Sequence, residues 1–179
     1  SRILLPVGVG KVAAAQNIAS YFVTIAALGL PSYGVREFAK VRENKCKRNK
    51  LFTELFLLNI ISTTLAVVGF WVLVTINMGF QGEWILYGAC GLAIVFNYLN
   101  IDWMYMGLEE YGYITGRSLL IKAVSLVTLF LLVKTKQDYV LYALISSLAT
   151  GGNYIFNVIH ARKFIKINFS GIQIRRHLK

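Results

Sequence analysis

Acidic residues, prolines and cysteines are scarce in this sequence. It contains 8 Asp and Glu against 19 Lys and Arg, with 2 prolines and 2 cysteines. Cys46 lies in a basic stretch and Cys90 in an apolar one, which favours neither a disulfide nor a metal site. No P-loop, zinc motif, nucleophile elbow or dinucleotide fingerprint occurs. We therefore expect no enzyme, no metal and no cofactor.

Charge is absent from long parts of the sequence. The stretches without Asp, Glu, Lys or Arg are 12–35, 55–82, 84–101 and 139–161, and Lys122 is the single charge in 118–133. A helix that crosses the hydrocarbon core needs about 20 mostly apolar residues. The pattern predicts an all-α membrane protein, a polytopic helical bundle. Its five transmembrane helices are expected near residues 12–31, 55–78, 84–101, 117–134 and 139–160.

The basic residues predict the orientation of these spans. Lys and Arg concentrate in 36–50 and 161–179, whereas 79–83 contains none. The positive-inside rule then places 36–50, 102–117 and 161–179 in the cytoplasm. We expect a multi-pass protein of the cytoplasmic membrane. Because this orientation accounts for the net charge of +11, we expect no nucleic-acid partner.

The same orientation places Ser1 outside, with no signal peptide before it. We therefore expect a further helix ahead of residue 1. Residues 161–179 mix apolar and basic side chains, which predicts an amphipathic cytoplasmic linker. The expected organisation is a partial N-terminal transmembrane lobe over 1–160 and a linker over 161–179 that leads to a missing second lobe.

Each predicted span carries polar residues at helical spacing. They are Gln16, Asn17, Ser20, Tyr21 and Thr24; Asn59, Ser62 and Thr63; Asn97 and Asn100; Ser118, Lys122, Ser125 and Thr128; and Ser146, Thr150, Asn153 and Asn157. In one interpretation they join helices by hydrogen bonds worth about 0.6 kcal/mol each. In the other, which we favour for the whole set, they line one hydrated cavity and bind sugar hydroxyls or a headgroup.

The charges near the spans have alternative interpretations. Lys122 lies roughly 7 Å inside its span, where it either snorkels to the interface or contacts an anion in the cavity. Asp102 and the neighbouring acids Glu109 and Glu110 lie among interfacial aromatic residues, which favours a surface role. Glu54 follows Lys50 by four residues, which predicts an exposed ion pair.

Short motifs follow one another along the chain. They are LGLPSYGVREFAKVR at 28–42, LFTELF at 51–56, NIDWMYMGLEEY at 100–111 with Ile114-Thr115, Val133-Lys134 with Asp138-Tyr139 and Tyr142, and RHLK at 176–179. In this order they resemble helix ends and loops of Wzx-type polysaccharide flippases, which belong to the MOP (MATE-like) exporter superfamily. The resemblance spans nearly the whole chain.

The resemblance implies a transporter with two six-helix lobes, of which this chain is helices two to six of the N-terminal lobe. Such a flippase moves a polyprenyl-pyrophosphate-linked oligosaccharide across the membrane by alternating access. The implied partners are that lipid-linked oligosaccharide, membrane lipids and the second lobe of the same protein.

We expect two kinds of substrate-binding residue. The cations that would hold the pyrophosphate are Arg36, Arg117 and Lys122, since guanidinium and ammonium groups pair with phosphate oxygens. The amides that would line the route of the sugar are Gln16, Asn17, Asn59, Asn97, Asn100, Asn153 and Asn157.

Three alternatives fit less well. A cation-coupled multidrug exporter of the same fold is expected to keep acids deep in its spans, and here the acids lie near span ends. A membrane enzyme such as a glycan polymerase or acyltransferase is expected to carry a catalytic cluster in a large outer loop, and the predicted outer loops are short. A purely structural module has no need of aligned polar stripes.

Overall fold

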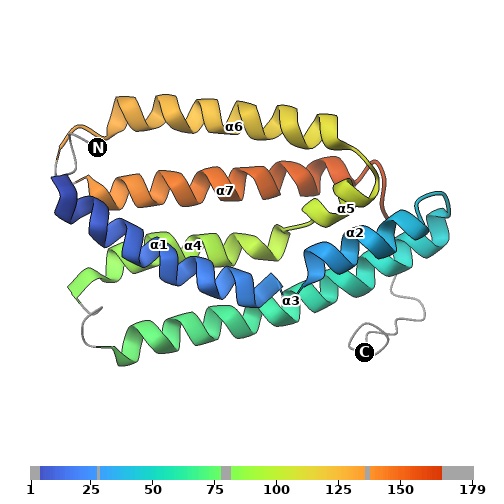
Figure 1. The fold of residues 1–179 in the computed structure, drawn as a ribbon, viewed down its shortest axis with the longest axis horizontal. Coiled ribbons are helices and arrows are strands. Elements are labelled where there is room, and N and C mark those ends of the chain that lie inside the picture. Colours follow the sequence, from blue (N-terminus) through green and yellow to red (C-terminus); the bar gives the residue numbers. More distant parts are fainter. Residues whose placement is uncertain (1–4, 28, 78–81, 136–137, 167–179) are drawn as a thin grey trace.

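A computed structural model describes residues 5–27, 29–77, 82–135 and 138–166 of the chain. Within these ranges the chain is a helical bundle without strands (Figure 1). The elements are α1 (Leu5–Ala27), α2 (Leu30–Lys40), α3 (Lys45–Ile76), α4 (Trp84–Phe96), the short 3-10 helix η2 (Asn97–Leu99), α5 (Asp102–Gly107), α6 (Tyr111–Leu132) and α7 (Tyr139–Ala161). The predicted all-α fold is confirmed.

Several of these helices suit a membrane. Three stretches are long and apolar enough to cross one: Gly8–Lys40, which combines α1 and α2, Lys45–Ile76 and Tyr111–Leu132. Trp84–Leu99 is apolar but shorter, and α7 has 23 residues, a sufficient length for a span. The chain is therefore an all-α membrane protein, while the count of five spans stays a prediction.

Local sequence explains where the first helices end. Gly29 has a φ of 74°, in the left-handed region that favours glycine, and Pro31 occupies the first turn of α2. The predicted span 12–31 therefore ends in a corner between α1 and α2. Asn44 caps α3 by accepting the Lys47 N–H at 3.1 Å. With 32 residues, or about 48 Å, α3 projects its basic first turns beyond a hydrocarbon core of about 30 Å.

The helices pack unevenly. The central helix α7 packs against α4, α6 and α1, and α1 also packs along α3. At the edge of the bundle, α6 runs beside α7 (Figure 1, top), and only Ile121 among its residues is buried. The remaining apolar surface of α6 is therefore free to face lipid.

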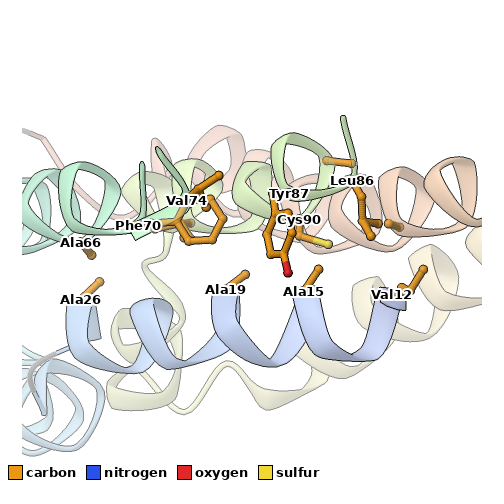
Figure 2. Packing of buried hydrophobic residues seen from close by; sticks show 13 residues of the cluster. Val12, Ala15, Ala19, Ala26, Ala66, Phe70, Val74, Leu86, Tyr87 and Cys90 are labelled. Atoms are coloured by element: carbon orange, nitrogen blue, oxygen red, sulfur yellow. The ribbon is translucent and has the colours of Figure 1, made fainter. Parts of the chain in front are cut away.

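Two apolar clusters form the core. In the first, Ala15 and Ala19 of α1 face Phe70 of α3 and Cys90 of α4 (Figure 2). Small side chains let membrane helices approach closely, so the alanines bring α1 onto its neighbours. The second cluster joins α2, the start of α3, α5 and the end of α7 around the side chains Phe38, Leu55, Trp103, Met104 and Tyr105.

Candidate functional site

Polar side chains lie between the two apolar clusters. On α3, Asn59 and Thr63 are buried between Leu55 of one cluster and Ala66 of the other. Hydrogen bonds join them to polar residues of η2, α5, α6 and α7 and to Asn100, which lies between η2 and α5. We call the whole set the polar layer, and it consists of Asn59, Thr63, Asn97, Asn100, Asp102, Arg117, Ser118, Asn153 and Asn157.

The first part of the layer contains uncharged groups from α3, η2 and the residue that follows η2. Asn59 Nδ2 donates to the carbonyl oxygens of Asn97 at 2.8 Å and Tyr98 at 3.3 Å. Asn97 Nδ2 donates to Thr63 Oγ1 at 2.9 Å, and Asn97 Oδ1 accepts from Asn100 at 3.1 Å. Since the last carbonyls of a helix lack partners within it, Asn59 stabilises the end of α4.

This arrangement corrects one sequence-based boundary. A continuous helix was predicted over 84–101, but α4 ends at Phe96, η2 follows, and Asn100 is extended with a ψ of 103°. The physical reason is that side-chain amides take over the hydrogen bonds of the helix end.

The second part of the layer is charged and joins α5, α6 and α7. Arg117 donates to the carbonyl oxygen of Asn153 at 3.1 Å and to Asp102 Oδ1 at 3.4 Å. Asn157 Nδ2 donates to the same carboxylate oxygen. The Arg117 side chain is only 7% exposed, so its charge is balanced by Asp102 inside the protein.

The two parts form one network. The backbone N–H of Asp102 donates to Asn100 Oδ1 at 3.4 Å, so hydrogen bonds continue from α3 through η2 to α7. The charged part retains unused bonding capacity, because Arg117 Nε and Asn157 Oδ1 are buried without a hydrogen-bond partner among the described residues.

Aromatic residues fasten the end of α7 beside this layer. Tyr105 donates its hydroxyl to the carbonyl oxygen of Asn157 at 2.6 Å, and burial raises the pKa of Tyr105 above its usual range. Tyr113 donates to the carbonyl oxygen of Phe156 at 3.0 Å, and its ring stacks on His160 with 3.9 Å between centroids. The sequence indicated only interfacial aromatics here. The contacts were missed because they depend on the approach of α5, α6 and α7.

The structure thus brings together most of the predicted site residues, but inside the bundle. Asn59, Asn97 and Asn157 are enclosed by protein. Of the predicted cations, Arg117 is buried with Asp102, whereas Arg36 and Lys122 are exposed. No contact among the described residues joins these three cations to one another.

The exposed candidates lie on α1, α2 and α6. Arg36 pairs with Glu37 at 3.3 Å and lies over the Tyr33 ring at 5.5 Å. Lys122 has no side-chain partner among the described residues. The side chains of Gln16, half-buried, and Asn17, exposed, also have none there.

The two faces of α1 differ in chemistry. Ala15, Ala19 and Ala26 point toward α3 and α4 (Figure 2), whereas Asn17, Ser20 and Tyr21 lie on the opposite side and are exposed. The Ser20 hydroxyl donates to the carbonyl oxygen of Asn17 at 2.7 Å, within its own helix. The Asn17 side-chain amide on this face therefore remains available to bind a molecule outside the bundle.

A smaller polar contact joins the opposite ends of the helices. Lys11 of α1 lies 2.5 Å from Glu83 Oε1, and the Tyr139 hydroxyl donates to Glu83 Oε2 at 2.9 Å. The Lys11 ammonium, followed by the Tyr139 hydroxyl, holds the pKa of Glu83 below its usual range. The sequence did not predict this contact, since its three members are far apart along the chain.

The exposed ion pair predicted for Glu54 and Lys50 is wrong. Glu54 is only 4% exposed, because α2 packs against this face of α3. Both residues line a hollow between the two helices.

Within the described residues, no group of three His, Cys, Asp or Glu side chains is placed to bind a metal.

The fold and the polar layer define a helical membrane protein whose spans are joined by buried hydrogen bonds. The family model described as polysaccharide biosynthesis protein matches residues 1–178. Because this match covers nearly the whole sequence, the chain belongs to the polysaccharide biosynthesis protein family. No curated protein and no solved structure was matched significantly.

Proposed function

We propose that this chain is part of a Wzx-type flippase of the MOP superfamily and a transporter rather than an enzyme. Its substrate would be a polyprenyl-pyrophosphate-linked oligosaccharide, carried across the cytoplasmic membrane by alternating access. The observation that carries the proposal is the family match over residues 1–178. The proposed orientation keeps 36–50, 102–117 and 161–179 in the cytoplasm.

The exposed polar groups support a hydrated route beside the bundle. An amide or ammonium group in contact with hydrocarbon costs several kcal/mol. Asn17 on α1 and Lys122 on α6 are exposed within helices that are apolar enough to span a membrane. In the proposal these side chains face water, with Gln16 and Asn17 contacting sugar hydroxyls.

The cations then take different roles. Lys122 and Arg36 bind the pyrophosphate, since both are exposed and Lys122 has no competing partner among the described residues. Arg117 is a positioning residue, because its side chain is only 7% exposed and its two terminal nitrogens already bond Asn153 and Asp102. The buried amides Asn59 and Asn97, with the other members of the polar layer, hold the helices in register.

The test is glycan export by the full-length protein carrying Lys122→Gln. Export is expected to fall at least about tenfold, which corresponds to the loss of one charge-assisted contact. Lys122→Arg should retain most export. The matched control is Lys134→Gln, an exposed lysine just beyond the end of the same helix. Equal export by Lys122→Gln at an equal membrane level would refute the assignment of Lys122.

A cation-coupled multidrug exporter is the alternative, and one observation favours it. Glu54 is a buried acid inside α3, the kind of group that coupling to protons or sodium uses. Glu54→Gln separates the two functions. Loss of drug efflux together with normal glycan export would favour the exporter, whereas unchanged drug resistance in cells that lack the whole gene would exclude it.

A further inference from the structure

A hollow between α2 and α3 has no role in the proposed transport route. Its volume is about 430 Å³, within the range of about 300–1,000 Å³ that is usual for small-molecule sites. Its lining residues are Tyr33, Glu37, Lys40, Val41, Lys47, Lys50, Leu51 and Glu54. We call it the α2–α3 pocket.

Some charged side chains of this pocket have an ion-pair partner and others have none among the described residues. Lys40 lies 2.7 Å from Glu37, and Arg36 also approaches that carboxylate at 3.3 Å. The side chains of Lys47 and Lys50, in contrast, have no ion-pair or hydrogen-bond partner among the described residues. The pocket therefore presents two ammonium groups that are available to an anion.

The position of the pocket matches the headgroup region of a membrane. Lys50 lies about 7.5 Å along α3 from Leu55, where the charge-free stretch begins. Val41 and Leu51 supply an apolar part of the wall beside the lysines. A ligand that combines a phosphate with an apolar tail fits both kinds of lining.

The acids narrow the choice of ligand. Glu54 is 4% exposed and lines the same pocket as the lysines. A carboxylate repels a bare phosphate dianion but accepts hydrogen bonds from hydroxyl groups. A phosphodiester with a hydroxylated headgroup places its negative charge beside the lysines and only neutral hydroxyl groups beside the carboxylate.

We propose that the α2–α3 pocket binds the headgroup of an anionic glycerophospholipid, with phosphatidylglycerol as the best chemical match. Lys47 and Lys50 contact the phosphodiester, and the glycerol hydroxyls point toward Glu54. Basic pockets between membrane helices are a recurrent way of binding anionic lipids. This lipid is distinct from the transported substrate, and the site does not depend on the proposed function.

The experiment titrates phosphatidylglycerol onto the full-length protein in detergent and counts bound lipids by native mass spectrometry. The variant Lys47→Gln/Lys50→Gln should lower the bound fraction at least about fivefold, as loss of two contacts predicts. Lys47→Arg/Lys50→Arg should bind as the parent does. The matched control, Lys45→Gln/Lys134→Gln, removes the same charge from exposed lysines outside the pocket lining and should bind normally.

Three results would overturn the proposal. Equal loss of binding in the control variant would mean that diffuse surface charge, rather than the pocket, attracts the lipid. Equal binding of phosphatidylcholine would remove the requirement for an anion. Displacement of the lipid by millimolar inorganic phosphate would make the ligand a soluble anion. Thermal unfolding of each variant confirms that the protein compared is folded.

Discussion

The two parts of the polar layer use similar residues in different ways. In the amide part, the side-chain nitrogen and oxygen of both Asn59 and Asn97 have a hydrogen-bond partner. In the charged part, Arg117 Nε and Asn157 Oδ1 have none among the described residues. A fully bonded network fixes one arrangement, whereas spare donors and acceptors allow a second one. The comparison indicates that α3 and α4 move together, while α6 and α7 are better suited to rearrange.

The largest loss of stability is expected from breaking the ion pair in the charged part of the polar layer. Arg117→Leu leaves the Asp102 carboxylate, 30% exposed, without its cation and should lower the free energy of unfolding by about 4 kcal/mol. Unfolding in mixed detergent micelles measures this. Adding Asp102→Asn removes the stranded charge and should recover much of the loss. A double variant as unstable as the single one would show that charge is not the cause.

A substitution in the amide part of the polar layer should lower the free energy of unfolding less than one in the charged part. Asn97→Leu removes the donor to Thr63 and the acceptor for Asn100 but keeps the carbonyl oxygen that Asn59 uses. We expect a loss of about 2 kcal/mol in the free energy of unfolding, measured as for Arg117→Leu. Asn17→Leu, at an exposed amide, is the control and should change stability by less than about 0.5 kcal/mol. A loss larger than that of Arg117→Leu would reverse the comparison.

A glycine sets how closely the two parts approach. A Cβ on Gly151 of α7 would overlap the ring of Phe96, the residue directly before Asn97. Gly151→Ala should push α7 from the end of α4 and cost about 1.5 kcal/mol. Gly116→Ala is the control, since a Cβ there meets nothing within 4 Å. Equal unfolding midpoints for both variants would mean that the contact with Phe96 adapts without cost.

The ion pair of Lys11 and Glu83 at the opposite ends of the helices should have the smallest effect on stability. That effect should be visible mainly as a dependence of the unfolding midpoint on pH. The pKa of Glu83 is lower in the folded protein, so the pair with Lys11 contributes fully above the unfolded-state pKa near 4.5. That contribution is lost as the pH falls through the folded value. The unfolding midpoint of Glu83→Gln should therefore fall less than that of the parent on acidification. Glu43→Gln, at an exposed acid, should behave as the parent does.

The comparison also separates what the sequence can predict from what it cannot. Helical spacing placed Asn59 and Asn97 on inner faces, because lipid disfavours amides whatever their partner. Spacing does not reveal whether an inner amide meets water or another amide. That outcome depends on the distance between helices, which the glycine and alanine contacts set.

Charged residues show the same limit. Glu54 has the spacing of a surface pair with Lys50, yet α2 covers it. Asp102 looked like one member of an interfacial acid cluster, and its bond to Arg117 depends on how α5 meets α6. Each prediction used neighbours along one helix, and in each case a residue of another helix decided the environment.

The alanine face of α1 has a mechanical consequence. In lipid, helices gain no hydrophobic energy from meeting, so this contact depends on dispersion between close surfaces. Ala15 and Ala19 are one turn apart, so a shift of α1 by about 5.4 Å along its axis moves one alanine into the place of the other. Such sliding breaks the partly exposed ion pair of Lys11 with Glu83, whereas moving α6 separates the buried Arg117 side chain from Asp102. Of the two helices, α1 is therefore the one that can change register with the smaller loss of buried polar contacts.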